Sequence, residues 1–467
     1  MKSDGERVTG NFNTDSQELS RSLKSRHIQM IAIGGAIGTG LFLGSGTAIH
    51  EAGPSVILSY FITGIFCFFL MRAIGELLLS NTALHSFIDF VGVYLGNGLK
   101  FITGWTYWLC WISIAMADLT ASGIYMRFWF PWLPQWITPL VIILLLLLVN
   151  LVNVKMFGEM ESWFSLIKVV AIIFLIVVGL YLIAIGFQAG NAPRASFTNL
   201  ISHGGFFPTG VHGFLQSFQM IVFAFVGIEM VGVTAGETEN PQVNLPKAVN
   251  NLPVRIGLFY IGSMIIIMSV YPWNMISESQ SPFVQVFGDV GIQSAAAIIN
   301  FVVLTAALSA CNSAIFTTSR TLRSLSSSAD APKIFHHLSK HHVPNVSLLF
   351  SSLILLIVVA LNYFVPDQVF ALISGVATIN FLFVWSILIL AHLAFKKNYK
   401  YESTFKAPMY PYADYATLLF FFAIAVILLI TPGTRVALII STFWFIGMYV
   451  AYLLIKRHRM IGDGHHG

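Results

Sequence analysis

The chain has 467 residues, of which 56% are hydrophobic and only 10% are charged, and its formal net charge is +5 at pH 7. A soluble domain typically carries about 25% charged residues, so this composition excludes a soluble fold and indicates an all-α polytopic membrane protein. Membrane topology explains the basic excess, which therefore requires no nucleic acid or acidic partner.

About 20 apolar residues are needed to cross the hydrocarbon core of a bilayer. By that measure the sequence predicts twelve transmembrane helices, with no long soluble domain between them. In chain order they cover residues 28–49, 55–79, 101–127, 137–154, 163–186, 212–235, 254–276, 291–319, 346–364, 367–394, 413–431 and 436–456, between an N-terminal tail (1–27) and a C-terminal tail (457–467).

The distribution of Lys and Arg predicts the orientation, because these residues favour the cytoplasmic side of a membrane. With the N-terminus inside, the predicted outside loops contain only Arg127, Arg194 and Arg435 of the 25 basic residues. Lys168 lies within a predicted helix, and the others lie in or beside regions predicted to be inside. Both termini are therefore predicted to be cytoplasmic.

The first predicted helix contains the stretch IAIGGAIGTGLFLGSG (31–46), in which six of the sixteen residues are glycine. Glycine weakens a helix interior by about 1 kcal/mol relative to alanine, so an interruption is expected here. The sixth helix contains a glycine at a comparable place, in AFVGIE (224–229). Close packing of neighbouring helices through small residues is the alternative explanation for these glycines.

The two interrupted helices occupy corresponding positions if helices 1–5 (28–186) and helices 6–10 (212–394) form two repeats. A repeat of five helices ends on the opposite side of the membrane, so the second copy must be inverted. The last two helices (413–456) are then additional. Paired interruptions in an inverted repeat indicate the substrate site of a transporter.

An unwound turn frees backbone groups that lipid cannot satisfy, so it requires a cavity, a ligand or neighbouring protein. The half-helix that begins near Thr39 and Gly40 presents N–H groups and a positive dipole end, which suit a carboxylate. The carbonyl groups around Ile33, Gly34 and 223–225 suit an ammonium group. Together these groups predict a zwitterionic ligand, an α-amino acid.

Ionisable side chains within transmembrane helices are costly and are functional candidates by default. The third helix contains Asp118 and the fifth contains Lys168, while Glu229 follows the interruption in the sixth. Two alternatives stay open: Asp118 can hydrogen-bond a neighbouring helix, and Lys168 can extend to the interface. In the second helix, Arg72 and Glu76 are four residues apart and can form a structural ion pair.

A predicted cytoplasmic loop contains four histidines in HHLSKHH (336–342). No cysteine or carboxylate accompanies them, which favours a solvated loop over a metal site. The intramembrane charges are dispersed over four helices instead of forming a catalytic set. The sequence therefore predicts neither an enzyme nor a bound metal or cofactor.

Several motifs resemble the amino acid transporter family of the amino acid–polyamine–organocation superfamily. They are SRHIQMIAIGGAIGTGLFLGSG, MRAIGELL, WFSLIKV, FAFVGIEMVGVTAGETENP and NSAIFTTSR, and the resemblance extends over nearly the whole chain. Within the family, CWISIAMAD, GELLLSN, VKMFGEMESWF and FAFVGIE are most similar to bacterial D-serine/D-alanine/glycine permeases and to serine/alanine permeases of lactic acid bacteria.

The resemblance implies twelve helices with a five-plus-five inverted repeat, and proton-coupled uptake across the bacterial plasma membrane. It also implies that Lys168 occupies the place where sodium-coupled relatives of the fold hold their ion. The lysine would then lie between carbonyls of the first helix and hydroxyls of the eighth, at Ile33, Gly34, Ser309 and Ser313. Burial disfavours the charged form of lysine, which gives Lys168 a route to exchange protons.

The expected function is therefore proton symport of small neutral amino acids, namely serine, alanine, glycine and their D-enantiomers. Backbone groups of Gly38, Thr39 and Gly40 would hold the carboxylate, and carbonyls of Ile33, Phe223 and Ala224 would hold the amine. Phe223 or Phe225 would close the pocket, Trp111 and Asp118 would limit side-chain size, and Glu229 would relay protons or act as a gate. The alternatives are a permease for aromatic or basic amino acids, and a receptor or enzyme that does not transport.

Overall fold

The computed structural model describes residues 37–81, 84, 86–152, 155–188, 192–229, 240–278, 280–289, 293–339, 343–398 and 405–463. All regular elements within these ranges are helical. Nine helices in this part of the chain are long and apolar enough to cross a membrane, and two shorter apolar helices cover Ile137–Leu151 and Gly210–Phe225. The prediction of a polytopic helical membrane protein is confirmed.

The first half of the chain contains the helices that correspond to predicted helices 1–5. Their bounds are α2 (Thr39–Phe42), α3 (Gly44–Ala52), α4 (Val56–Ser80), α5 (Phe87–Leu95), α6 (Asn97–Met126), α7 (Ile137–Val152) and α8 (Lys155–Ala184). The sequence did not predict the short helix α5. It also placed the start of α8 at residue 163 instead of Lys155, a difference that matters for the site below.

The second half follows the predicted order with three additional short helices, α9, α12 and α15. The bounds are α9 (Asn199–Ser202), α10 (Gly210–Phe225), α12 (Pro241–Asn250), α13 (Leu252–Arg255), a π-helical segment (Ile256–Gly262), α14 (Ser263–Val270), α15 (Pro282–Asp289), α16 (Gln293–Ser327), α17 (Asn345–Phe364), α18 (Val369–Asn398), α19 (Tyr412–Ile430) and α20 (Arg435–Asp463).

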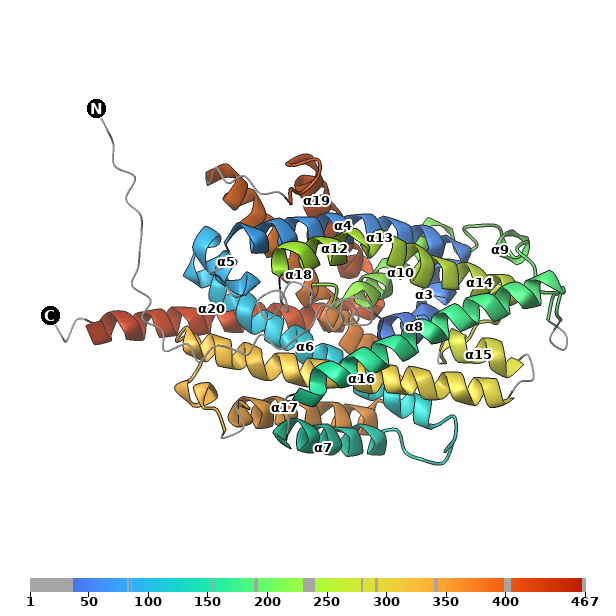
Figure 1. Ribbon diagram of the computed structural model, residues 1–467, viewed down its shortest axis with the longest axis horizontal. Coiled ribbons are helices and arrows are strands. Elements are labelled where there is room, and N and C mark those ends of the chain that lie inside the picture. Colours follow the sequence, from blue (N-terminus) through green and yellow to red (C-terminus); the bar gives the residue numbers. More distant parts are fainter. Residues whose placement is uncertain are drawn as a thin grey trace.

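The long helices run mostly along one axis of the molecule, and their connections alternate between its two ends (Figure 1). Helix α5 and the C-terminal end of α20 lie at one end, whereas α9 and α15 lie at the other (Figure 1). This arrangement is the one that a multi-pass helical protein requires, because each helix must return the chain across the bilayer.

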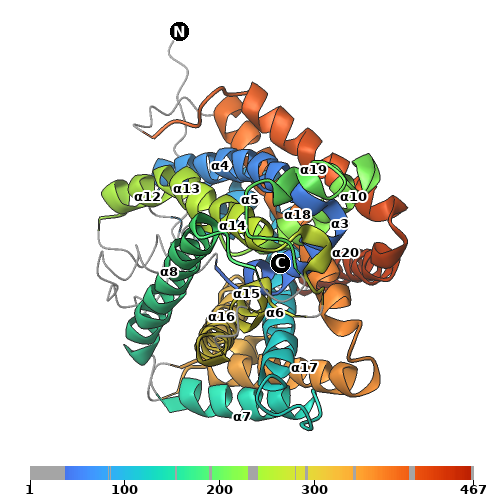
Figure 2. The ribbon, with the colours of Figure 1, turned by 90° about the vertical axis from the view of Figure 1, so that its right-hand side faces the viewer.

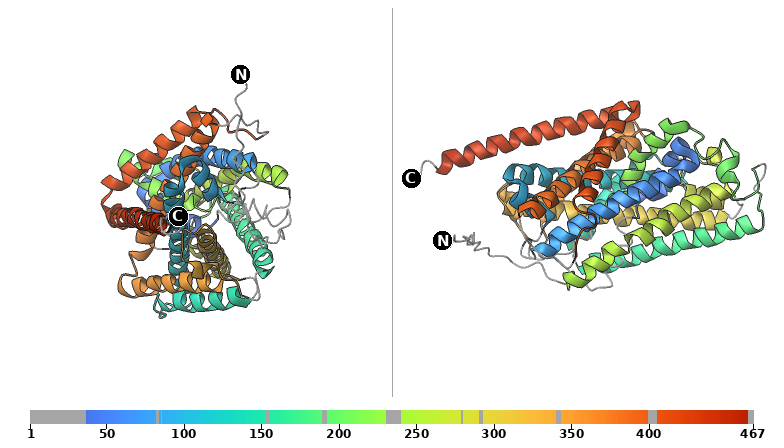
Figure 3. Two further views of the ribbon diagram at one scale, coloured as in Figure 1. Left: turned by 90° about the vertical axis from the view of Figure 1, so that its left-hand side faces the viewer. Right: turned by 90° about the horizontal axis from the view of Figure 1, so that it is seen from above.

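Helix α6 is central, and it packs against α16, α18, α5, α7, α17 and α20. Viewed along the long axis, α4, α7, α8 and α20 lie around this centre (Figure 2). The most apolar window of α6 is 78% buried, whereas that of α20 is only 6% buried. Helix α20 therefore runs along the outside of the bundle (Figure 3). Polar residues in the middle of α6, such as Ser113, Asp118 and Thr120, are buried.

Candidate functional site

The first glycine-rich segment enters the described part of the chain at residue 37, and regular helix starts two residues later. Gly38 is extended, with φ −132° and ψ −161°, and α2 begins at Thr39. The amide of Leu41 donates to the carbonyl of Gly38 at 3.1 Å. The N–H groups at the start of α2 precede this first bond, so they have no partner within the helix and point toward the break.

A second break follows α10, which ends at Phe225. Val226 is extended, with φ −60° and ψ 140°, and Gly227 has φ +94°. This left-handed conformation is readily adopted only by glycine, so Gly227 allows the chain to turn where AFVGIE interrupts the helix. At this break the i to i+4 pattern ends: the Phe223 carbonyl accepts the N–H of Val226 at 3.2 Å, and the Phe225 carbonyl accepts that of Ile228 at 3.3 Å.

The two interrupted segments touch each other at Gly40. A Cβ atom built on Gly40 would lie 2.6 Å from the Cα of Ala224 and 3.1 Å from the carbonyl oxygen of Phe223. Only a residue without a side chain permits this approach of two backbones. The start of α2 and the end of α10 therefore come together in the interior.

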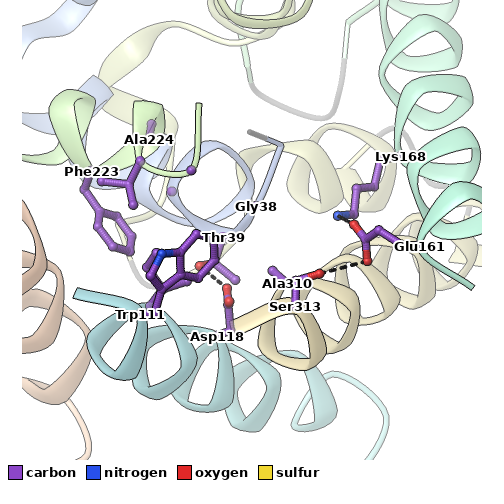
Figure 4. A pocket seen from close by; sticks show the side chains of 14 residues that line it. Gly38, Thr39, Trp111, Asp118, Glu161, Lys168, Phe223, Ala224, Ala310 and Ser313 are labelled. Atoms are coloured by element: carbon purple, nitrogen blue, oxygen red, sulfur yellow. Dashed lines mark hydrogen bonds and ion pairs between the residues drawn. The ribbon is translucent and has the colours of Figure 1, made fainter. Parts of the chain in front are cut away.

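A small cavity of about 40 Å³ lies beside this crossing (Figure 4). This space suffices for roughly three water molecules. Nine of the residues that the sequence proposed for the site line it: Gly38, Thr39, Gly40, Trp111, Asp118, Lys168, Phe223, Ala224 and Ser313. Gly38 immediately precedes α2, and the others come from α2, α6, α8, α10 and α16. The fold thus brings together positions that are far apart in the sequence.

Asp118 of α6 links this central helix to α2. The hydroxyl of Thr39 donates a hydrogen bond of 2.7 Å to Asp118 Oδ1, and both side chains are buried. Asp118 Oδ2 is also buried and accepts no hydrogen bond from the described residues. A buried carboxylate oxygen without a donor is costly, and because Asp118 lines the cavity, this oxygen is available to a ligand donor.

Lys168 lies on another wall of the cavity, where it faces a second carboxylate. Its Nζ is 3.9 Å from Glu161 Oε1, and the two side chains are only 1% and 2% exposed. Glu161 Oε2 accepts hydrogen bonds from Ser309 at 2.6 Å and from Ser313 at 3.1 Å. The carboxylate thus connects α8 to α16, and Figure 4 shows it between Lys168 and Ser313.

Glu161 is the functional candidate that the sequence analysis missed. The predicted fifth helix began at residue 163, and Glu161 was therefore assigned to a loop. In the structure α8 begins at Lys155, so Glu161 lies on the same face of the helix as Lys168, two turns earlier. Ser309 and Ser313 were predicted to contact Lys168, and in the structure their hydroxyls donate to the Glu161 carboxylate. The available signal was the pattern Glu161–Ser165–Lys168, which places polar residues on one helical face.

Phe225 and Glu229 lie away from the cavity, unlike the other candidates on the sixth helix. The Phe225 ring stacks on Tyr260 with centroids 5.0 Å apart and lines a separate small cavity. Glu229 is completely buried and does not line the central cavity. Phe223, in contrast, lines the central cavity. Ile33 and Gly34 lie outside the described residues.

The ion pair between Arg72 and Glu76 that the sequence predicted for the second helix is not formed. Arg72 donates to Asn250 Oδ1 at 2.7 Å and to the carbonyl of Lys406. Glu76 instead accepts a hydrogen bond of 2.8 Å from Lys396. A spacing of four residues brings two side chains to one face of a helix, but here partners from other helices compete successfully for both.

Comparison with known proteins gives consistent matches over nearly the whole chain. A family model described as "Amino acid permease" matches residues 27–461. The chain is 57% identical to the amino-acid permease AapA of Bacillus subtilis over 457 residues, which cover 96% of this chain and 99% of the relative. It is 48% identical over 448 residues to the D-serine/D-alanine/glycine transporter of Escherichia coli, covering 95% of both. It is 40% identical over 444 residues to the aromatic amino acid transport protein AroP of Escherichia coli, covering 94% and 97%.

Proposed function

Because the chain belongs to the amino acid permease family, we propose that it is a proton symporter for small neutral amino acids. Family membership confirms the resemblance carried by its motifs and identifies a multi-pass amino acid permease that is not an enzyme. The observation that carries the proposal is the cavity where the start of α2 meets the broken end of α10.

The zwitterionic part of the substrate binds to backbone groups on the two sides of this crossing. The N–H groups at the start of α2, from Gly38 to Gly40, have no partner within the helix and hold the carboxylate. The carbonyls of Phe223 and Ala224 hold the ammonium group. The Phe223 carbonyl already accepts the N–H of Val226 at 3.2 Å, and that of Ala224 accepts the Tyr260 hydroxyl at 3.1 Å. Each carbonyl oxygen has a second lone pair for the substrate. We also assign the carbonyl of Ile33 to the ammonium group.

The rest of the cavity limits the substrate to a small side chain. The space for roughly three water molecules is far too small for an aromatic side chain, which favours serine, alanine or glycine. Trp111 and Asp118 form the wall that a substrate side chain faces, and Phe223 covers the cavity from α10. Similarity to the D-serine/D-alanine/glycine transporter supports this class of substrate, and for that reason the proposed substrates include the D-enantiomers.

Proton coupling is assigned to the charged wall of the cavity. Lys168 attracts the carboxylates of both Glu161 and Asp118. Loss of its proton would leave two buried carboxylates without a compensating charge, which is strongly unfavourable. Lys168 therefore holds its proton until a conformational change alters these contacts, which couples proton release to alternating access. Ser309 and Ser313 position Glu161 in this exchange.

We extend the proposal to the overall architecture and orientation. Twelve helices form a five-plus-five inverted repeat (28–186 and 212–394), followed by two additional helices (413–456). Both terminal tails, 1–27 and 457–467, are cytoplasmic, and the membrane is the bacterial plasma membrane. Helix bundles rock against each other around the cavity. Glu229, buried behind the break in α10, acts as a proton relay or gate.

The direct test is uptake by full-length protein in proteoliposomes. Labelled L-serine, D-serine, L-alanine and glycine are supplied with and without an imposed pH gradient. We expect accumulation above equilibrium only when the outside is more acidic. Equal uptake with and without the gradient would exclude symport. Competition by phenylalanine or lysine at low concentration would favour the larger-substrate alternative, which similarity to the aromatic transporter keeps open.

Asp118→Asn is expected to reduce serine uptake more than alanine uptake. The buried Asp118 Oδ2 is placed to accept the hydroxyl of serine, and a hydrogen bond to a charged group is worth about 1.5–3 kcal/mol, or roughly 10- to 100-fold in affinity. Competition of the unlabelled amino acids against labelled glycine measures the ratio. Asp367→Asn, at an exposed position, is the control. An unchanged ratio of serine to alanine uptake in Asp118→Asn would show that Asp118 does not bind the serine hydroxyl.

Glu161→Gln is expected to weaken the pH-gradient-driven accumulation about tenfold while the protein stays folded. The amide keeps an acceptor for Ser309 and Ser313 but removes the charge that faces Lys168. Glu278→Gln removes a carboxylate that is 53% exposed and should accumulate substrate normally. The comparison is made in proteoliposomes with matched protein content. Normal accumulation by Glu161→Gln would show that Lys168 functions without its counter-charge.

A further inference from the structure

A second cluster of buried ionisable side chains lies outside the substrate cavity. Its centre is His392 on α18, which is completely buried. His392 Nδ1 is 2.6 Å from Asp414 Oδ2 on α19, and its Nε2 is 3.2 Å from Glu76 Oε2 on α4. One imidazole ring therefore joins three helices through two carboxylates.

Other polar groups complete the surroundings of this ring. Glu76 also accepts hydrogen bonds from Lys396 at 2.8 Å and from the backbone N–H of Ala407 at 2.6 Å. The ring of Tyr410 stands edge-on to His392, with centroids 5.8 Å apart. In the described part of the chain, the titratable and charged groups around His392 are Glu76 and Arg72 on α4, Lys396 on α18 itself, Tyr410, and Asp414 on α19.

The hydrogen-bond geometry determines the number of protons in the cluster. A neutral imidazole has one N–H donor and one bare nitrogen that can only accept. Ionised carboxylates can only accept as well, so a neutral ring satisfies one of its two neighbours and repels the other. One additional proton makes both ring nitrogens donors. It also places a positive charge between the two carboxylates, which stabilise it.

We propose that Glu76, His392 and Asp414 form a proton-binding site, separate from the substrate cavity, that fastens α4 to α18 and α19 while the proton is bound. Loss of the proton places a nitrogen lone pair against a carboxylate in a buried setting, where the repulsion is weakly screened. One of the two links between helices then breaks. The site is defined by contacts within the folded chain and does not depend on the identity of the transported substrate.

Thermal unfolding of the full-length protein in detergent between pH 5.5 and 8.5 tests this site. The contribution of the bound proton is present at low pH and is lost as the pH rises. In His392→Gln both amide N–H donors are on a single nitrogen, so the side chain cannot replace donors on the two sides of the ring at any pH. The melting temperature of wild type should therefore exceed that of the variant by several degrees at pH 5.5, and this gap should shrink as the pH rises. A gap of constant size would show that His392 only packs in the core.

Two further variants keep the test decisive. His50→Gln removes a histidine that pairs with Glu278 at 2.8 Å on the surface, where both side chains are about half exposed, and it should follow wild type at every pH. Asp414→Asn keeps an acceptor for the ring but removes one charge that holds the proton. If His392→Gln gives no folded protein, Asp414→Asn should shift the pH-dependent loss of stability to lower pH. An unshifted midpoint would overturn the proposal.

Discussion

Lys168→Ala is expected to abolish accumulation driven by a pH gradient while part of the substrate exchange remains. The buried ammonium faces Glu161 at 3.9 Å on the wall of the cavity, and the proposed carboxylate and amine sites do not include it. Removal of the lysine therefore eliminates the proton-exchanging group and leaves the crossing of α2 and α10 in place. The accumulation ratio should fall to the value found without a gradient.

The measurement combines two assays on the same proteoliposomes. Gradient-driven uptake reports coupling, and counterflow with substrate on both sides reports binding and alternating access. Lys100→Ala is the matched control, because Lys100 pairs with Asp89 at 3.1 Å in a partly exposed position on α6 and α5. Unchanged gradient-driven accumulation by Lys168→Ala would exclude this residue as the proton carrier, and loss of both activities would indicate a structural role.

Gly40→Ala is expected to abolish both uptake and exchange. The added methyl group would lie 2.6 Å from the Cα of Ala224 and 3.0 Å from its amide nitrogen, which are backbone atoms that cannot rotate away. The two interrupted segments must then separate, which costs about 1–3 kcal/mol by analogy with overpacked cores. The separation also moves the N–H groups of α2 away from the carbonyls of α10, which together form the proposed substrate site.

Gly447→Ala provides the comparison for Gly40→Ala, because Gly447 lies on the exposed side of α20 and its added methyl group would contact nothing within 4 Å. It should transport as wild type does. Binding of glycine and serine by purified protein, together with uptake, distinguishes a closed site from a misfolded chain. Normal binding by Gly40→Ala would show that the close approach at this residue is unnecessary for substrate recognition.

Hydrophobic composition and periodicity were sufficient to predict the class of fold and most helix positions. Apolar segments must be helical in lipid because every backbone group needs an internal partner. The same reasoning identified Asp118 and Lys168, since a charge within such a segment is costly and conspicuous. Helix ends are harder to predict from hydropathy. Glu161 precedes the apolar part of α8, in a polar stretch whose hydropathy does not distinguish a helix from a solvated loop.

Pairing between helices could not be predicted in the same way. Arg72 and Glu76 have the spacing of an ion pair, yet Arg72 binds Asn250 and Glu76 binds Lys396. Likewise Ser309 and Ser313 face Glu161 instead of contacting Lys168 directly. A local spacing fixes which residues share a helical face, but the partner of each side chain depends on how the helices are packed.

The sequence by itself determined which segments cross the membrane and where glycine weakens their helices. It also identified the charged side chains whose burial in the membrane costs enough free energy to indicate a function. Only the tertiary structure decided that Gly40 meets Ala224, that Thr39 binds Asp118, and that His392 joins Glu76 to Asp414. The physical reason is that burial energies are properties of each segment, whereas hydrogen bonds and close backbone contacts require two segments to be placed within a few ångströms of each other.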